Sequence, residues 1–456
     1  MSRAGTSTEP GPVATQPGVA PLLDVVRRHR SGEPVGIASV CSAHPLVLRA
    51  AVAQAVADGT ALLVEATSNQ VDQFGGYTGM RPADFRDLVL RIADEGGLSA
   101  DRVVLGGDHL GPNAFRDRGA DEAMALAEDL VRAYVDAGYA KIHLDCSMAC
   151  AGDTLPLSDE VVAARAARLA RAAEDAAVAA FDRSEVVYVV GTEVPVPGGA
   201  HEEIDELRPT APEAARATLL AHREAFAAAG VPDAFDRVVA LVVQPGVEFD
   251  ATRVVDYDRS RTTQLRAVVD APEAPPSLVL EAHSTDYQTG EHLRALVEDH
   301  WAVLKVGPGL TFALREALFA LAAIEDVMIP TGDASHLVQV VDTVMRDAPR
   351  WWEGYYDGDD RAQSLARVYS WSDRMRYYWP DPQISAAQER LMANLGRTGI
   401  PLPLLSAHLP DQYVRVRAGS LATDPASLVV DKVRDVLRLY AAACEPRADR
   451  PVRRTP

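Results

Sequence analysis

Residues 277–325 read SLVLEAHSTDYQTGEHLRALVEDHWAVLKVGPGLTFALREALFALAAIE, and they contain one pattern twice. A short apolar run, 277–282 or 301–307, ends in polar or small residues, and a segment of helical composition follows it. Near-continuous hydrophobicity over such short runs is typical of strands that are covered on both faces, as in a parallel sheet. The stretch therefore predicts two successive β/α units.

The same unit recurs throughout the preceding chain. Eight units over about 300 residues match a (β/α)8 barrel better than an open doubly wound sheet. No G-x-G-x-x-G follows the first run, so the chain lacks the glycine-rich motif that is typical of a dinucleotide-binding sheet. We predict an α/β protein with a TIM barrel over residues 22–330. The six further strand-like runs are 35–40, 61–66, 102–107, 140–145, 186–191 and 237–243, and helices are expected at Pro45–Asp58, Arg81–Glu95, Asp121–Ala137, Ser158–Ala180, Ala211–Ala229 and Leu310–Ile324.

The pattern changes after residue 330, where aromatic side chains concentrate. We expect a smaller helical C-terminal domain over 331–446, followed by a tail at 447–456, and a disordered Gly/Pro-rich tail at 1–21. The aromatic residues are expected to build the core of that domain and its seam with the barrel; an oligomer interface is the alternative. They are Trp351, Trp352, Tyr355, Tyr356, Tyr369, Trp371, Tyr377, Tyr378 and Trp379.

Composition excludes several classes of protein. The formal net charge of -20 argues against a nucleic-acid partner and against docking on anionic membranes. Four cysteines are too few for a disulfide scaffold, and no apolar stretch is long enough to span a bilayer. The N-terminus lacks the pattern of a signal peptide, so a cytoplasmic location is expected.

Polar and ionisable residues stand at the end of every predicted strand, where TIM barrels carry their active sites. Carboxylates and imidazoles that converge on one buried mouth require a positive charge among them, and a divalent cation meets that need. His109 and His283 are the best candidate ligands, with Glu193 and Asp145 next. His44 is either a ligand or a cap of the helix that Pro45 opens, and His143, inside its run, is interpreted as structural.

Lys305 is one of only three lysines, the others being Lys141 and Lys432. It is expected to bind a substrate or an anion, to pair with Glu65 or Glu281 in the lumen, or to form a Schiff base. After it, Gly307-Pro308-Gly309 opens a helix where barrels often hold a phosphate on backbone N–H groups. Ser284 and Thr285 would complete that phosphate pocket.

Long contiguous motifs resemble one family. They are CSAHPLV (41–47), EATSNQVDQFGGYTGM (65–80), GGDHLGPN (106–113), GTEVPVPGG (191–199), VVQPGVEFD (242–250), EAHSTDYQT (281–289) and LKVGPGLTFALREA (304–317). Over about residues 22–445 the chain is similar to the GatZ/KbaZ family, the partner subunit of tagatose-1,6-bisphosphate aldolase, also labelled tagatose-6-phosphate kinase.

A more distant resemblance to the class II aldolases implies roles for single residues. Asp108-His109 looks like the pair in which the histidine binds metal and the aspartate moves a proton, and His283 looks like the last metal histidine. Glu193 stands where that family has its remaining histidine, so a carboxylate replaces an imidazole. The resemblance implies zinc, with Mn, Ni or Co as alternatives. No G-x-x-x-x-G-K-[ST] occurs, so we expect no nucleotide cofactor.

We therefore expect a component of a class II-type tagatose-1,6-bisphosphate aldolase in ketohexose phosphate catabolism of the galactitol or tagatose type. The chain is expected to form an oligomer, and a catalytic class II aldolase subunit is a candidate partner. Asp108 or Glu193 would act as general base, with Asp145 as a further catalytic carboxylate. A ketohexose 4-epimerase that uses the same site, a non-catalytic stabilising subunit and, last, a sugar-phosphate kinase are the alternatives. The residues expected to bind substrate or phosphate are Lys305, Gly307, Gly309, Ser284, Thr285, Gln244, Asn69, Glu65 and Ser42.

Overall fold

Eight parallel strands close into a barrel in the order β1-β10-β9-β6-β5-β4-β3-β2. The computed structural model describes residues 18–191 and 207–446. Each strand coincides with one predicted run, which confirms the (β/α)8 barrel. A short antiparallel pair, β7 (Glu248–Phe249) and β8 (Val254–Val255), follows the sixth barrel strand. The barrel strands are β1 (Ile37–Val40), β2 (Leu62–Thr67), β3 (Val103–Leu110), β4 (Lys141–Leu144), β5 (Val187–Val190), β6 (Val238–Val242), β9 (Val279–Ala282) and β10 (Trp301–Val306).

Helices surround the barrel at the predicted positions. The second helix shows how local sequence sets its ends: Pro45 opens it, the Nδ1 of His44 accepts the backbone N–H of Leu46, and Gly59 ends it with φ 71°. No helix in the described ranges is long and apolar enough to cross a membrane. The covering helices are α2 (Pro45–Asp58), α3 (Pro82–Glu95), α4 (Ala120–Asp136), α5 (Asp159–Phe181), α6 (Pro212–Ala228), α7 (Pro232–Phe235) and α8 (Gly290–Glu298).

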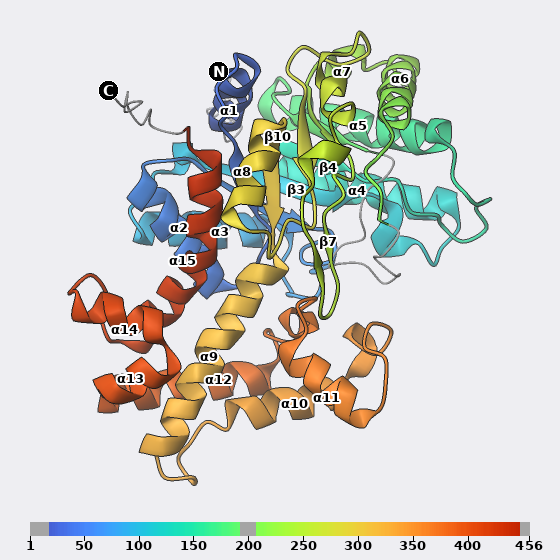
Figure 1. Cartoon of the computed structure of the whole chain (residues 1–456). Coiled ribbons are helices and arrows are strands. Elements are labelled where there is room, and N and C mark those ends of the chain that lie inside the picture. Colours follow the sequence, from blue (N-terminus) through green and yellow to red (C-terminus); the bar gives the residue numbers. More distant parts are fainter. Residues whose placement is uncertain (1–17, 192–206, 447–456) are drawn as a thin grey trace, which may run out of the picture.

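One end of the barrel is closed by α1 (Ala20–Arg30), which lies across it in Figure 1. Leu22 and Val26 of this helix are buried in one apolar cluster with lumen residues such as Leu63 and Val104. These are residues near the N-terminal ends of their strands. This end of the lumen is therefore filled by hydrocarbon.

The C-terminal helices lie at the opposite end. The long helix α9 (Pro308–Met328) leads from the barrel into them, and α15 (Pro425–Cys444) returns to pack against α2, α8 and α9 (Figure 1). The division of the chain at residue 330 stays a prediction. The helices between them are α10 (Leu337–Asp347), α11 (Asp360–Tyr369), α12 (Pro382–Thr398), α13 (Leu402–His408) and α14 (Pro410–Arg417).

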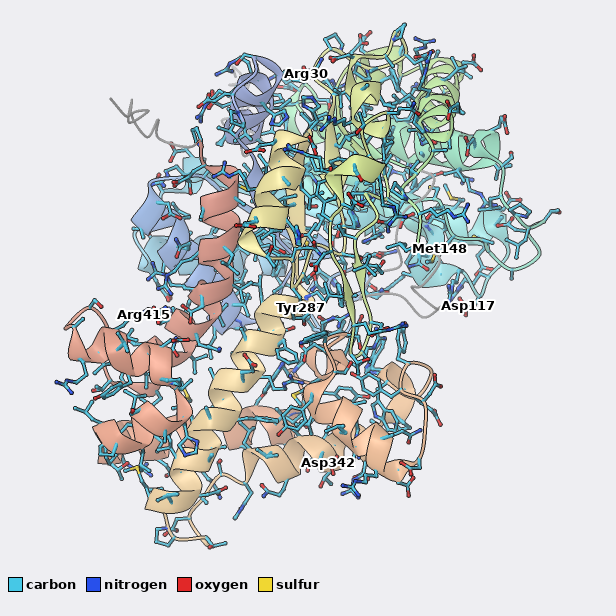
Figure 2. All side chains as sticks on the ribbon, viewed as in Figure 1. Arg30, Asp117, Met148, Tyr287, Asp342 and Arg415 are labelled. Atoms are coloured by element: carbon cyan, nitrogen blue, oxygen red, sulfur yellow. The ribbon has the colours of Figure 1, made fainter. Side chains whose placement is uncertain are left out.

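Aromatic side chains form the seam between these helices and the barrel mouth. Tyr287, which follows β9 and is labelled in Figure 2, stacks on Trp371 with ring centroids 5.4 Å apart and donates its hydroxyl to the Trp371 carbonyl. Tyr77 packs edge to face on Tyr377, with ring centroids 4.8 Å apart. These contacts hold the C-terminal helices over the open end of the barrel.

Candidate active site

Two buried lysines and two glutamates form a layer of ion pairs across the lumen. Lys141 Nζ lies 2.7 Å from Glu65 Oε1 and 2.8 Å from Glu281 Oε2, and all three side chains are fully buried. Lys305 Nζ lies 2.8 Å from Glu65 Oε2, the ion pair considered from the sequence, and 2.9 Å from Asp108 Oδ1. A Cβ on Gly106 would lie 2.7 Å from Glu65 Cγ, so only glycine leaves room for this glutamate.

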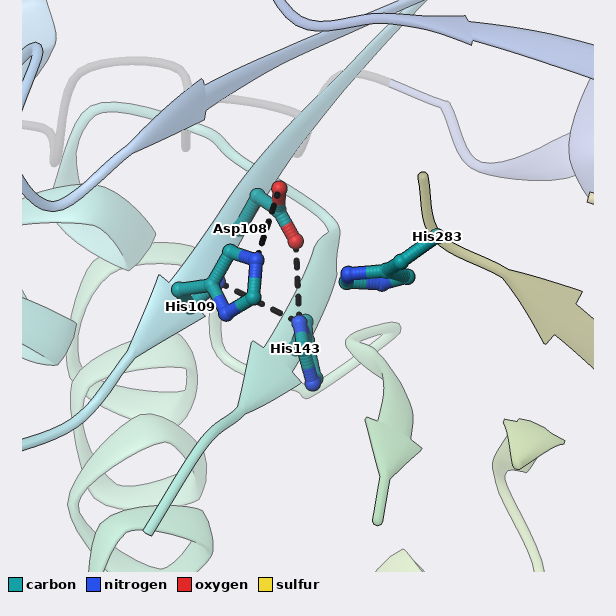
Figure 3. A group of neighbouring side chains, drawn as sticks. All are labelled: Asp108, His109, His143 and His283. Carbon is teal, nitrogen blue, oxygen red and sulfur yellow. Dashed lines mark hydrogen bonds and ion pairs between the residues drawn. The ribbon is translucent and has the colours of Figure 1, made fainter. Parts of the chain in front are cut away.

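Directly above this layer, three imidazoles and a carboxylate converge (Figure 3). We call Asp108, His109, His143 and His283 the His3Asp cluster; one ligand atom of each lies within 4.8 Å of the others. All four residues are buried. Nitrogen and oxygen donors in this combination are those that zinc takes from proteins.

A local distortion of β3 brings two consecutive residues of this cluster into the lumen. Side chains alternate between the faces of a strand, so Asp108 and His109 would normally point in opposite directions. His109 instead has φ 50°, and the pairing of β3 with β4 shifts register between Gly107 and Leu110. A positive φ is costly for a residue with a side chain and is found where function demands it.

Each imidazole of the cluster has a carboxylate on one ring nitrogen. His109 Nδ1 lies 2.7 Å from Asp145 Oδ2, His143 Nδ1 2.9 Å from Asp108 Oδ1, and His283 Nε2 3.0 Å from Glu281 Oε1. At His109 and His283, if that nitrogen donates its proton to the carboxylate, the other nitrogen keeps a lone pair for a metal. His143 Nδ1 faces both Asp108 and the backbone N–H of His109, which lies 3.2 Å away and donates to it. His143 Nε2 is buried and has no partner among the described residues. The cluster therefore fits a divalent metal.

The electrostatics of the cluster are consistent with this fit. Burial lowers the pKa of His283 to about 4, so its imidazole is neutral at physiological pH. Burial opposes the charge of Asp108, but the nearby His109 and Lys305 outweigh it and hold the pKa of this carboxyl well below its usual value. Burial likewise opposes ionisation of Asp145, but the hydrogen bond and charge of His109, with His143 and Ser147, together outweigh it and lower the pKa of this carboxyl. Asp108 and Asp145 in turn raise the pKa of His109 despite its burial, so a cation bound at His109 would replace the proton that these carboxylates favour there.

A small cavity of about 80 Å³ opens over the cluster. Asp108, His109 and His283 line it from the barrel, and Arg376 and Tyr377 line it from the C-terminal region. A second cavity of about 320 Å³ adjoins it, and the two share Cys41, Gln70, Tyr77 and Arg376 among their lining residues. The open end of the barrel and the C-terminal helices thus enclose one composite site.

Comparison with known proteins places the chain in a family. Residues 22–445 match the model of the D-tagatose-1,6-bisphosphate aldolase subunit GatZ/KbaZ-like family. The chain belongs to the GatZ/KbaZ-like family. A crystal structure titled as a probable tagatose 6 phosphate kinase from Sinorhizobium meliloti 1021 is 48% identical, covers 90% of this chain and 100% of its own, and superimposes with a TM-score of 0.82.

Two aldolase structures show lower similarity. A putative fructose-1,6-biphosphate aldolase from Coccidioides immitis is 16% identical, covers 84% of this chain and 98% of its own, and has a TM-score of 0.42. Fructose-bisphosphate aldolase from Campylobacter jejuni is 12% identical, covers 83% and 92%, and has a TM-score of 0.44. We draw no activity and no substrate from either at these values.

In this GatZ/KbaZ-like protein, the backbone N–H groups that were expected to bind phosphate are already bonded to a carboxylate. The backbone N–H groups of Gly307 and Gly309 both donate to Asp286 Oδ1, at 3.0 and 2.7 Å. A carboxylate at this helix N-terminus repels a phosphate. Thr285 is buried away from the cavity, where its hydroxyl contacts Tyr440.

The other predicted substrate residues divide into two groups. Ser284, Asn69 and Lys305 line the small cavity, whereas Ser42 lines the larger one. Gln244 caps the turn after β6, since its side-chain oxygen accepts the N–H groups of Gly246 and Val247, and it lines neither cavity. Glu193, expected as a ligand and a base, lies in 192–206, outside the described residues.

Sequence reasoning missed two members of the GatZ/KbaZ-like site. His143 was interpreted as structural because it lies inside a strand, yet it joins the cluster. The signal was its position: Lys141, His143 and Asp145 are two residues apart, so all three share the lumen face. Arg376 directly precedes the aromatic run 377–379 of the C-terminal region, and no local pattern relates it to the barrel mouth.

Proposed function

We propose that this chain is a metal-dependent subunit of a tagatose-1,6-bisphosphate aldolase, and that it breaks and forms the C3–C4 bond of a ketohexose or ketohexose phosphate. The observation that carries this proposal is the His3Asp cluster, in which three carboxylate-backed imidazoles and Asp108 meet at the barrel mouth. Membership of the GatZ/KbaZ-like family supports the aldolase role.

His109, His143 and His283 would hold the metal, with Asp108 or a further carboxylate completing the set. A bound divalent ion, zinc or alternatively Mn, Ni or Co, polarises the carbonyl and hydroxyl oxygens of the sugar. Asp145 and Glu281 orient His109 and His283 through the ring nitrogens that face away from the metal. These carboxylates act by positioning and do not touch the substrate.

Asp108 would act as the general base on the C4 hydroxyl. The carboxylate is ionised at neutral pH, so it is ready to accept a proton. As the C4 hydroxyl proton passes to Asp108, the C4–O electron pair forms a carbonyl and the C3–C4 bond breaks. Its electron pair forms a C2–C3 double bond and leaves the negative charge on the former C2 carbonyl oxygen.

Lys305 would stabilise this charge as an ammonium ion. It lines the same cavity, and although burial alone lowers its pKa, the adjacent Asp108, Glu65 and other charges raise it well above the usual value. A lysine held in its charged form is a poor nucleophile, so the Schiff-base alternative loses support. A fixed ammonium in a buried site is an effective electrostatic catalyst.

The kinase name of the Sinorhizobium protein is not carried to this chain. The sequence has no phosphate-binding loop of the G-x-x-x-x-G-K-[ST] type, since a glycine precedes none of its three lysines. The chemistry of the His3Asp cluster suits bond cleavage next to a carbonyl rather than transfer of a nucleotide phosphate.

The test is to incubate the purified chain with fructose, tagatose, their 6-phosphates and their 1,6-bisphosphates, after chelation and after reloading with zinc or manganese. Triose products support the proposal, and C4-epimeric sugars also support it because they require the same bond to break and re-form. The isosteric variant Asp108→Asn should lose about 10²- to 10⁴-fold in rate while still binding metal. Products that appear only with an added aldolase chain, and are indifferent to Asp108→Asn, would contradict it in favour of a stabilising subunit.

A further inference from the structure

The usual phosphate position of a TIM barrel is closed in this molecule. That position is the N-terminus of the helix that follows the eighth strand. Here the N–H groups of Gly307 and Gly309 already bond to Asp286, and a Cβ on Gly309 would lie 3.0 Å from the same carboxylate oxygen. A phosphorylated substrate therefore needs a different cationic partner.

Arg376 is the cation that remains available. Among the described residues, Lys305 and Arg376 are the Lys and Arg side chains that line the two cavities. The charge of Lys305 is balanced by Glu65 and Asp108. No described carboxylate oxygen lies within 4.0 Å of the Arg376 guanidinium. Its charge is felt by Asp286 and Asp373, but among the described residues it forms no direct ion pair with either.

The structure holds this guanidinium in a fixed orientation. It lies 4.5 Å from the centroid of the Tyr377 ring, and one of its nitrogens lies 3.0 Å from the Tyr377 hydroxyl. Another donates to the carbonyls of Ser372 and Asp373, the latter at 3.0 Å. These bonds use three of the five guanidinium N–H groups, so two remain for an anion.

A second network fixes the short turn η7 (Arg374–Tyr377) that carries Arg376 to the helix leaving the barrel. Asp373, with φ 42°, accepts the hydroxyl of Thr311 at 2.5 Å and lies 3.7 Å from Arg315. Thr311 and Arg315 belong to α9, which begins directly after β10. The turn is therefore registered to the barrel mouth, and Arg376 keeps a defined position relative to the His3Asp cluster.

We infer that Arg376 is the anion-recognising residue of this site and that it binds one phosphoryl group of a phosphorylated ketose, at the end away from the His3Asp cluster. The inference rests on the proposed function for the identity of the ligand as a ketose. Guanidinium groups with two free N–H donors recognise phosphate oxygens in a paired geometry. A second phosphoryl group finds no further unpaired cation among the described lining residues.

The test is binding without turnover. Fructose, fructose 6-phosphate and fructose 1,6-bisphosphate are titrated by calorimetry, or by ligand NMR where binding is weak, into the metal-loaded chain in the Asp108→Asn background, where turnover is suppressed. We expect the 6-phosphate to bind about 100-fold more tightly than fructose, and the bisphosphate to gain no more than about threefold over the 6-phosphate. Arg376→Gln should abolish the preference for phosphate and change fructose binding by less than about threefold.

Two controls make the result decisive. Arg376→Lys keeps the charge and should still bind the 6-phosphate at least about tenfold more tightly than fructose. Arg350→Gln removes an exposed arginine that also stacks on a neighbouring ring, that of Trp351, and should leave the binding of all three ligands unchanged. The inference is overturned if the Arg376→Gln variant still prefers the 6-phosphate over fructose, or if it binds all three ligands more weakly by the same factor. It is also overturned if the chain that keeps Arg376 binds the bisphosphate tenfold more tightly than the 6-phosphate.

The outcome is separable from that of the proposed function. His143→Ala removes a member of the His3Asp cluster and leaves Arg376 in place, so the preference for the 6-phosphate over fructose should survive in it. Binding through Arg376 without cleavage or epimerisation would contradict the proposed function alone. Cleavage that is indifferent to Arg376 would contradict this inference alone.

Discussion

The two ends of the barrel lumen are built by the same strands, yet they have opposite chemistry. Residues two apart on a strand face the same side, so each inward-pointing pair samples both ends. In each pair, the residue nearer the end closed by α1 is apolar, and the residue nearer the mouth is polar or charged. The pairs are Ile37 and Ser39, Leu63 and Glu65, Val279 and Glu281, and Val303 and Lys305.

The contrast separates stability from chemistry within a single core. The apolar end needs only volume and hydrophobicity. The mouth buries ions that must find partners, bends β3 at His109, and leaves His143 Nε2 without a partner among the described residues. Local departures of this kind are expected where a structure serves function rather than stability.

The sharpest way to break the comparison is to remove His143. In His143→Ala we expect metal content to fall from one equivalent to near none, and activity to fall by on the order of 10³-fold, since a ligand at the centre of the site is lost. Metal analysis and a rate assay with excess metal measure this. His222→Ala is the matched control, because His222 is also fully buried with an unpartnered Nε2 but lies on α6. Equal metal loss in both variants would refute the role of His143.

The ion-pair layer below the cluster makes the next prediction. Lys141→Met leaves Glu65 and Glu281 buried without their shared ammonium, and we expect it to lower the free energy of unfolding by about 3–5 kcal/mol. Lys432→Met removes the surface pair with Glu316, at 3.3 Å, and should cost about 0–1 kcal/mol. Urea denaturation of the chelated protein compares the two. A small cost for Lys141→Met would show that the mouth tolerates unpaired charge.

Sequence reasoning reached the fold because the strands carry their own signal. Eight apolar runs spaced by helical segments specify the barrel without any long-range information, and polar residues at the strand ends located the mouth. The order of strands follows from the right-handed crossovers that such units require. Asp108, His109 and His283 could be assigned to the site for the same reason.

The remainder of the site depends on contacts that no local pattern encodes. His143 was missed because the alternation of side chains along β4 was not used to decide which of its residues face the lumen. Arg376 reaches the mouth through α9 and Asp373, a route more than sixty residues long in sequence. The phosphate cradle at Gly307 and Gly309 stays a prediction, and no local pattern shows that Asp286, three residues after His283, accepts both N–H groups.

At the apolar end, Leu22→Ala tests whether α1 serves stability alone. Leu22 is fully buried in the apolar cluster, so we expect a loss of about 2–5 kcal/mol in the free energy of unfolding. Leu23→Ala, at a neighbouring side chain with 36% of its surface exposed, should cost less than about 1 kcal/mol. Metal content and activity should be unchanged in both variants below their unfolding transitions. A loss of activity from Leu22→Ala in the folded protein would mean that the two ends are coupled.

The smallest effect concerns the pH dependence of the mouth. Burial raises the pKa of Asp286 to about 6, from an ordinary value of 3.8. The folded state then binds this proton more tightly than the unfolded chain, so the carboxyl lowers stability progressively as pH rises from about 4 to 6. Asp286→Asn keeps an oxygen that can accept the N–H groups of Gly307 and Gly309. The gain in the free energy of unfolding of this variant over the wild type should be larger at pH 7.5 than at pH 4, by about 1–3 kcal/mol.

The control has the opposite sign. The pKa of Asp258, an exposed carboxyl, is lowered by the hydroxyl and backbone N–H of Ser260, so its ionised form stabilises the fold above pH 4. Asp258→Asn should therefore reduce stability at neutral pH and leave it unchanged in acid. Thermal denaturation of the chelated proteins from pH 4 to 8 compares the slopes. If Asp286→Asn also loses stability at neutral pH, its carboxylate is stabilised at this helix N-terminus, and the closed phosphate position is a favourable cap rather than a buried charge that the fold tolerates.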